Sequence, residues 1–134
     1  MTQLTPESAP AASKSTKTIL IVDDNERLAR ALATVLRNAG YEPIVHHSGA
    51  ATLAYADGAT PAAAMIDIHL PDISGLVLAG KLREKYGPDL PIVIVSGDTS
   101  METINTLPHV GASYFFPKPV RADYLIERLH EWLT

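Results

Sequence analysis

Four short apolar runs along the chain each stop at a polar residue. The runs and the residues that follow them are Thr18 to Val22 before Asp23 and Asp24, Ala64 to Ile66 before Asp67, Ile92 to Val95 before Ser96, and Tyr114 to Phe116 before Pro117 and Lys118. A continuous apolar run of about four to eight residues is typical of a strand buried on both faces, as in a parallel sheet covered by helices. A less apolar run from Glu42 to about His47 predicts an edge strand.

Apolar residues between these runs recur at helical spacing and predict helices that cover the sheet. The expected helices run from Asp24 or Asn25 to about Gly40, from Ser48 to about Ala56, from roughly Gly75 to Tyr86, from Thr99 to Leu107, and from about Val120 onward. Pro108 should end or kink the fourth helix, because proline inside a helix costs about 3 kcal/mol. Alternating strands and helices with right-handed crossovers predict an α/β fold, a doubly wound sheet in three αβα layers.

The first residues of the chain do not share this pattern. Residues 1 to about 17 are rich in Ser, Thr, Ala and Pro and show no apolar period. Such a segment buries too little apolar surface to offset the entropy lost on ordering it. We therefore expect a flexible N-terminal tail over residues 1–17 and a folded domain over residues 18–134. The tail fits a tethering arm and an expression remnant equally well.

Composition narrows the function classes. Hydrophobic residues make up 46% of the 134 residues and charged ones 19%, as in ordinary globular domains. A net charge of -4 argues against electrostatic capture of nucleic acid or anionic lipid. The chain has no cysteine, which excludes disulfides, thiolate nucleophiles and zinc knuckles. It also lacks a membrane-length apolar stretch and a secretory signal, so we expect a cytoplasmic protein with no membrane contact.

Polar residues at the strand ends should meet at one edge of the sheet, where parallel α/β sheets bind ligands. Asp23, Asp24 and Asp67 bring carboxylates there, Ser96 a hydroxyl and Lys118 an ammonium group. Two carboxylates 4 Å apart repel by about 4 kcal/mol at an effective dielectric constant near 20, so such a cluster requires a cation. Mg²⁺ suits it, because this ion accepts a few carboxylates together with water and phosphate oxygens.

The same residues suggest phosphoryl transfer to an aspartate. Asp67 arrives alone on the central strand and is the natural nucleophile, while Asp23 and Asp24 arrive as a pair that can hold the metal. Lys118 can neutralise charge on the phosphoryl oxygens. Each residue alone is more commonly a helix cap, turn or loop residue. Their arrival in order at the ends of four strands favours a shared site.

These motifs together resemble the receiver domain of two-component response regulators. The resemblance covers about Thr18 to Leu133 and rests on Ile-Val-Asp23-Asp24-Asn-Glu, Asp67-Ile-His-Leu-Pro-Asp-Ile-Ser-Gly75, Val-Ser96-Gly and Phe-Pro-Lys118-Pro. It implies the flavodoxin-like strand order 2-1-3-4-5. It also implies that Asp67 accepts a phosphoryl group from a histidine of a sensor kinase or phosphotransfer protein, with Mg²⁺ bound.

The resemblance assigns a role to each site residue. Asp23, Asp24 and Asp67 would bind the metal together with the backbone carbonyl of His69, and Lys118 would bind the phosphoryl group. Ser96 would turn toward that group and Phe115 would then pack inward. This would change the face formed by the expected helix from Thr99 to Leu107, the strand that ends at Phe116 and the last helix, from about Val120 onward. The Lys118–Pro119 peptide bond would be cis. His69 and Asp98 could also flank the path of attacking water, or they could be solvated loop residues.

The expected function is a signalling switch whose output is contact with a downstream protein, without direct nucleic acid binding. Its only chemistry would be self-phosphorylation and autodephosphorylation, so it would not be an enzyme. It could also be a receiver fragment of a larger regulator or of a hybrid kinase. An aspartate-nucleophile phosphatase would need a general acid where His69 stands, and a flavodoxin-like cofactor carrier would need a hydroxyl-rich loop where Asp23 and Asp24 stand.

Overall fold

Five parallel strands form the centre of the protein, for which a computed structural model describes residues 17–134. The predicted tail, residues 1 to about 17, lies outside the described residues except for Lys17. The strands are β1 (Thr18–Val22), β2 (Glu42–His46), β3 (Ala63–Asp67), β4 (Ile92–Ser96) and β5 (Tyr114–Pro117). They are hydrogen-bonded in the order β2-β1-β3-β4-β5, which confirms the expected strand order. β3 extends one residue beyond each end of the apolar run from Ala64 to Ile66, and β5 extends one residue beyond Phe116.

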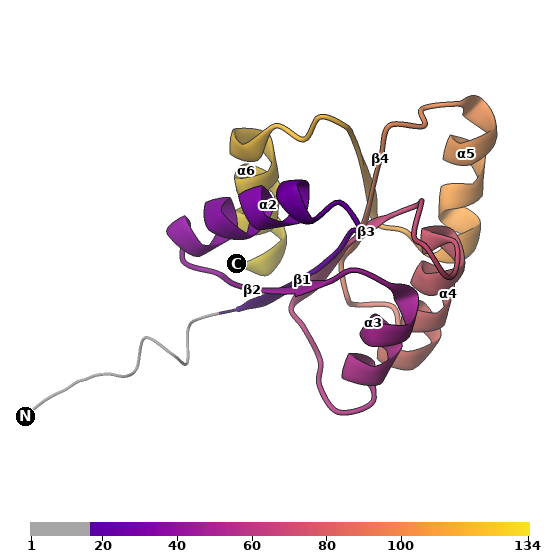
Figure 1. The fold of residues 1–134 in the computed structure, drawn as a ribbon, viewed down its shortest axis with the longest axis horizontal. Helices are drawn as coiled ribbons and strands as arrows, with labels where there is room; N and C mark the ends of the chain where they lie inside the picture. Colours follow the sequence, from indigo (N-terminus) through magenta and orange to yellow (C-terminus); the bar gives the residue numbers. More distant parts are fainter. Residues whose placement is uncertain (1–16) are drawn as a thin grey trace, which may run out of the picture.

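Helices cover both faces of the sheet. They are α2 (Glu26–Asn38), α3 (Gly49–Ala56), α4 (Gly75–Tyr86), α5 (Met101–Thr106), the 3₁₀ helix η1 (Leu107–Val110) and α6 (Ala122–Leu133). α2 and α6 lie on one face, and α3, α4 and α5 lie on the other (Figure 1). This arrangement confirms the three-layer α/β fold. Within residues 17–134, no helix combines the length and the apolar character that crossing a membrane requires.

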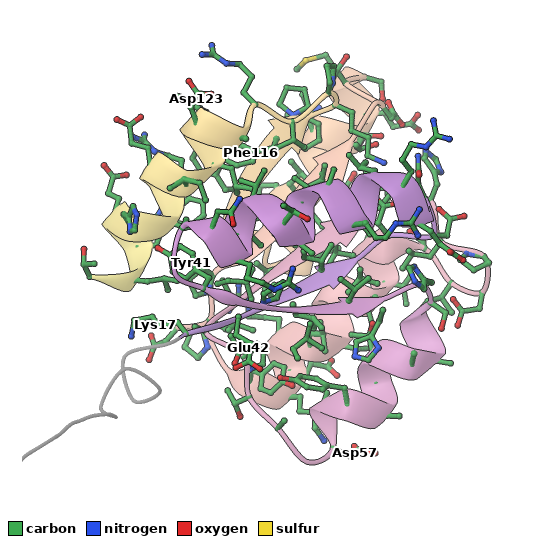
Figure 2. All side chains as sticks on the ribbon, turned by 60° about the vertical axis from the view of Figure 1, so that its left-hand side comes forward. Lys17, Tyr41, Glu42, Asp57, Phe116 and Asp123 are labelled. Atoms are coloured by element: carbon green, nitrogen blue, oxygen red, sulfur yellow. The ribbon has the colours of Figure 1, made fainter. Side chains whose placement is uncertain are left out.

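The core is split by the sheet into two apolar clusters. Successive side chains of a strand point to opposite faces, so Ile19 and Ile21 of β1 pack toward α2 and α6 while Leu20 and Val22 pack toward α3 and α4. Tyr41 and Phe116 belong to the first cluster and lie on the side of α2 and α6 (Figure 2). Both faces of the central strands are buried, which explains their continuous apolar sequences.

Helix boundaries follow the local sequence. The Asn25 side chain accepts a hydrogen bond of 3.1 Å from Leu28 N at the start of α2, and Ser48 Oγ accepts one of 3.2 Å from Ala51 N at the start of α3. Gly40, after α2, has a φ of 97°, a value that favours glycine. α5 ends before Pro108, and the chain continues as η1, which confirms the expected effect of that proline.

Prolines lie in both edge strands of the sheet. In β2, Glu42 N donates to Lys17 O at 2.9 Å, so the next backbone position, Pro43, faces the open side of the strand. In β5, Pro117 follows the apolar residues and immediately precedes Lys118. An edge strand tolerates a proline because it has a neighbour on one side only.

Candidate functional site

Strand register brings the ends of four strands to one edge of the sheet. Val22 of β1 lies beside Ile66 of β3, Asp67 of β3 beside Val95, and Ser96 of β4 beside Pro117. Asp23 and Lys118 directly follow β1 and β5, so they leave the sheet at the same edge as Asp67 and Ser96. The predicted site residues are therefore brought together, although they lie far apart in the sequence.

The carboxylates of Asp23, Asp24 and Asp67 form an acidic cluster at this edge. One oxygen of each lies within 4.8 Å of the others. The Asp23 and Asp67 residues are only 3% and 6% exposed, whereas Asp24 is exposed to solvent. Burial, and then the charge of Asp23, raise the pKa of Asp67 above its ordinary value. The site thus holds two carboxylates that are largely shielded from water.

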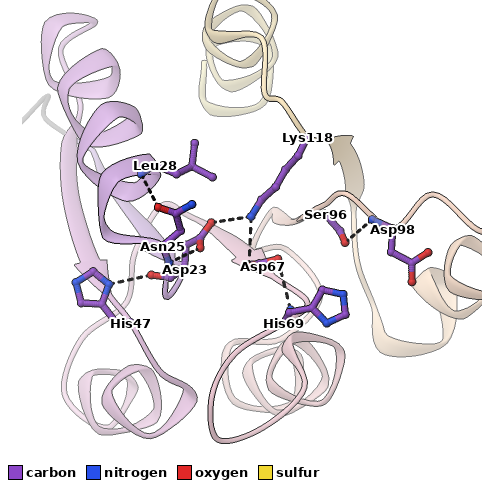
Figure 3. Close-up of polar contacts among 9 residues, drawn as sticks. All are labelled: Asp23, Asn25, Leu28, His47, Asp67, His69, Ser96, Asp98 and Lys118. Atoms are coloured by element: carbon purple, nitrogen blue, oxygen red, sulfur yellow. Dashed lines mark hydrogen bonds and ion pairs between the residues drawn. The ribbon is translucent and has the colours of Figure 1, made fainter.

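Lys118 partly compensates this charge. Its Nζ lies 3.2 Å from Asp23 Oδ2 and 3.3 Å from Asp67 Oδ2, so the ammonium group bridges the two buried carboxylates (Figure 3). The backbone N–H of Lys118 donates to Ser96 O at 2.9 Å, which fixes the end of β5 beside β4. The Lys118–Pro119 peptide bond is cis, in agreement with the resemblance. One ammonium group beside three clustered carboxylates leaves a net negative charge, which a further cation could balance.

The cluster fits the donor preferences of Mg²⁺. All three side chains offer oxygen ligands, and the exposed Asp24 leaves the cluster open to water, which this ion keeps in its shell. Asp67 Oδ1 accepts a hydrogen bond of 3.4 Å from His69 N, so the loop after β3 turns back around this carboxylate. The predicted metal-binding residues are therefore adjacent.

Ser96 lies beside the cluster and faces another partner. The residue is fully buried, and its Oγ accepts a hydrogen bond of 3.0 Å from Asp98 N. The Asp98 carboxylate in turn accepts from Ser100 N at 3.0 Å and from Thr103 Oγ1 at 2.7 Å, and these bonds lower its pKa. Phe115 is half-buried on the side of α3, α4 and α5. Ser96 is thus linked through Asp98 to the first turn of α5.

Two polar contacts near the site were not predicted from the sequence. His47 Nδ1 lies 2.8 Å from Asp23 O, and the Asp72 carboxylate accepts hydrogen bonds from Gly49 N and Ala50 N. The first contact joins the end of β1 to the end of β2, and the second joins α3 to the loop after β3. Each spans more than 20 residues of sequence. Histidine and aspartate are common in loops, and neither occurs here in a pattern that would have indicated the contact.

Comparison with known proteins gives consistent matches. Residues 19–130 match the family described as the response regulator receiver domain. The photosynthetic apparatus regulatory protein RegA of Rhodovulum sulfidophilum is 37% identical over 105 residues, which are 78% of this chain and 57% of RegA. The CAI-1 autoinducer sensor kinase/phosphatase CqsS of Vibrio cholerae serotype O1 is 28% identical over 123 residues, which are 90% of this chain and 18% of CqsS.

A solved structure agrees over nearly the whole domain. The CheY-like response regulator receiver domain protein of Methanospirillum hungatei JF-1 has a TM-score of 0.83 and 31% sequence identity, with 89% of this chain and 94% of that chain covered. By contrast, the chain spans about half of RegA and less than a fifth of CqsS. The similarity to these two proteins is therefore confined to one part of each.

Proposed function

This chain belongs to the response regulator receiver domain family, and from that premise we propose that it is a phosphorylation-controlled signalling switch. The observation that carries the proposal is the cluster of Asp23, Asp24 and Asp67 facing Lys118 at the carboxyl edge of the sheet. It unites a carboxylate nucleophile, ligands for a divalent cation and a positive charge for phosphoryl oxygens. Phosphoryl transfer to a carboxylate needs these groups within contact distance of one another.

Asp67 is the proposed phosphoryl acceptor. Lys118 Nζ and His69 N hold its two oxygens, so the carboxylate has a fixed orientation. In the proposed reaction one of these oxygens attacks the phosphorus of a phosphohistidine. The phosphorus–nitrogen bond breaks, its electron pair stays on the donor imidazole, and an acyl phosphate remains on Asp67. Lys118 would then balance charge on the phosphoryl oxygens.

Asp23, Asp24, Asp67 and the backbone carbonyl of His69 are the proposed Mg²⁺ ligands. The support is the oxygen-only donor set and the raised pKa of Asp67, which reflects burial first and then the charge of Asp23, against the lowering effect of Lys118. Bound there, the ion would neutralise carboxylate and phosphoryl oxygens together.

Ser96 and Phe115 are proposed to convert phosphorylation into a change of shape. A phosphoryl group adds about 1.5 to 2 negative charges and new acceptor oxygens. Ser96 gains a hydrogen bond by turning its hydroxyl toward them, and in doing so leaves Asp98 N, its present donor. Phe115 on β5 can then move into the space that Ser96 vacates. The affected face comprises α5, β5 and α6, where a downstream protein would bind.

The proposed partners are a sensor histidine kinase or a phosphotransfer protein as donor and a protein as target, all in the cytoplasm. RegA is described as a regulatory protein and CqsS as a sensor kinase/phosphatase, and this chain matches a part of each. Its natural setting is accordingly a separate receiver, a larger regulator or a hybrid kinase. A free phosphatase is disfavoured, since His69 stands where a second carboxyl would act as general acid.

Intact-protein mass measurement tests the proposal. Incubation with acetyl phosphate and Mg²⁺ should add one phosphoryl group to the wild type and none to Asp67→Asn. Asp57→Asn is the matched control, because Asp57 is an exposed aspartate paired with Lys85 at the far end of α3. That variant should be phosphorylated like the wild type. An unchanged wild-type mass at saturating donor would contradict the proposal.

A further inference from the structure

The loop between β3 and α4 is fastened to a second helix at its tip. Asp72 Oδ1 accepts a hydrogen bond of 2.9 Å from Gly49 N, and Asp72 Oδ2 accepts one of 2.8 Å from Ala50 N. Both oxygens of a single carboxylate thus bind consecutive amides at the start of α3. These contacts cross 23 and 22 residues of sequence and join the loop that follows Asp67 to a helix that precedes β3.

The Asp72 contact supplies the negative charge that the first turn of α3 lacks. The first amides of a helix have no partner within the helix, and negative charge near them is favourable. The first turn of α3 carries no acidic residue, and its cap Ser48 binds Ala51 N. The Asp72 carboxylate accepts hydrogen bonds from Gly49 N and Ala50 N, the two amides that Ser48 does not bind. These hydrogen bonds lower the pKa of Asp72, and the one from Gly49 has the largest effect. Charge-assisted hydrogen bonds of this kind are among the stronger polar contacts in proteins.

Close packing reinforces the same contact. A Cβ atom at position 49 would lie 2.6 Å from Ile73 Cγ1 and 3.4 Å from Asp72 Oδ1. The loop therefore approaches the α3 backbone as closely as a glycine permits. Asp72 and Ile73 together hold the loop tip through one polar and one apolar contact.

The base of this loop is fixed independently. Gly75 N donates to Ile68 O at 2.7 Å, and His69 pairs with Ser74 in a short antiparallel bridge. Because the base and the tip are both held, the backbone at His69 has a defined place beside Asp67. Without the Asp72 contact, the loop would keep its hydrogen bonds at the base and the apolar packing of Leu70 and Ile73, but it would have no polar contact with α3 at its tip.

We propose that Asp72 is a positioning residue for the metal site, acting through the backbone of the loop from Ile68 to Ser74. No contact joins it to the acidic cluster; it holds the segment that contains His69, whose carbonyl is a proposed metal ligand. The inference rests on the proposed function, because it presumes that a divalent cation binds at Asp67. It adds to that function a structural link between α3 and the affinity for the ion.

The test compares variants in the metal-free and Mg²⁺-bound protein. Asp72→Ala should speed amide exchange in the loop from Ile68 to Ser74 without metal, and should raise the Mg²⁺ Kd measured by calorimetry by about 3- to 10-fold. That range lies at or below the usual effect of removing a partner that contacts a metal ligand directly. Asp72→Asn keeps one acceptor oxygen and should have a smaller effect on both quantities.

Ser48→Ala is the matched control. It removes the cap of α3 and destabilises the same helix terminus, yet it leaves both Asp72 contacts in place. Its Mg²⁺ Kd should stay within about 2-fold of the wild type, as befits a residue outside the metal's surroundings. If the Mg²⁺ Kd is unchanged in Asp72→Ala, or if Ser48→Ala shifts it equally, this inference is wrong, while the proposed function still stands. No Mg²⁺ uptake by the wild type would overturn the proposed function as well.

Discussion

The two loops that border the acidic cluster are held to the protein in different ways. The loop after β3 is fastened at its base by Gly75 and at its tip by Asp72, and it leads into α4, where Leu78 and Leu82 are fully buried. The segment after β4 leads into α5 (Met101–Thr106), and no residue of this helix is buried. Met101 is 68% exposed. Polar contacts of Asp98 therefore contribute much of the attachment of α5.

In the proposed switch, this difference would separate phosphoryl transfer from the change of shape. Asp67 and the proposed metal ligand His69 lie on the firmly held side, where transfer of a phosphoryl group requires fixed geometry. Ser96 lies on the loosely held side, and its hydroxyl accepts a hydrogen bond from the backbone N–H of Asp98. The Asp98 carboxylate in turn accepts hydrogen bonds from Ser100, the N-cap of α5, and from Thr103 in its first turn. Segments that move in a switch come from the less stable parts of a protein. A small shift of Ser96 would therefore reach α5 more readily than α4.

The largest expected effect comes from adding a methyl group on the firmly held side. In Gly75→Ala the new Cβ would lie 2.0 Å from Asp67 O, an atom of the sheet backbone that cannot move away cheaply. We expect the free energy of unfolding to fall by about 3 kcal/mol or more, or the chain not to fold. Urea unfolding followed by circular dichroism measures the change.

Gly80→Ala is the control for this substitution. Gly80 lies within the same helix, and a Cβ there would meet nothing within 4 Å. Alanine at a helix interior is favoured over glycine by about 0.5 to 1 kcal/mol, so this variant should be slightly more stable than the wild type. Equal destabilisation by both substitutions would show that the close approach at Gly75 is unimportant.

An intermediate effect is expected from pH, with opposite signs on the two sides. Burial raises the pKa of Asp67, so the folded protein binds this proton more tightly than the unfolded chain does. The stability that this group contributes is present below its ordinary pKa of 3.8 and is lost as pH rises through the higher folded pKa. Hydrogen bonds from Ser100 and Thr103 lower the pKa of Asp98, so its contribution is present above 3.8 and is lost as pH falls.

Urea unfolding of the metal-free protein at a series of pH values isolates the Asp67 contribution. Asp67→Asn should gain stability relative to the wild type as pH rises above 3.8, because the variant carries no charge to desolvate. Addition of Mg²⁺ should narrow this difference, since only the wild type presents the full set of carboxylates. A stability difference that is independent of pH would contradict the raised pKa of Asp67 in the folded protein.

The smallest effect on global stability is expected on the loosely held side. Thr103→Val keeps the branched shape of the side chain and removes the hydroxyl that donates to Asp98 Oδ2. We expect the local opening free energy of α5 to fall by about 1 kcal/mol, with almost no change in global unfolding. Amide hydrogen exchange of residues 101–106 measures the local change.

Thr106→Val tests whether the connection to Asp98 is responsible. The Thr106 hydroxyl donates to the carbonyls of Glu102 and Thr103 within the same helix and does not reach the loop. Its loss should speed exchange less than the loss of the Thr103 hydroxyl. Similar exchange in the two variants would indicate that α5 is held by something other than Asp98.

Much of this architecture was predictable because it follows from periodic apolar residues. The runs before Asp23, Asp67, Ser96 and Lys118 predicted the strands, and parallel strands place their carboxyl ends at one edge. Long-range contacts between loops were not predictable. Nothing in the sequence around Asp72 indicates that its carboxylate meets Gly49, because the meeting depends on how α3 and the loop pack. The bond between Ser96 and Asp98 likewise depends on the turn after β4.

The proline in β2 has a consequence for how the protein behaves at high concentration. Pro43 faces the open side of an edge strand, where any other residue would present a free amide. A chain that paired with this edge would find no backbone donor at Pro43, the second residue of β2. The exposed edge of β2 is therefore a poor template for amyloid-like strand pairing.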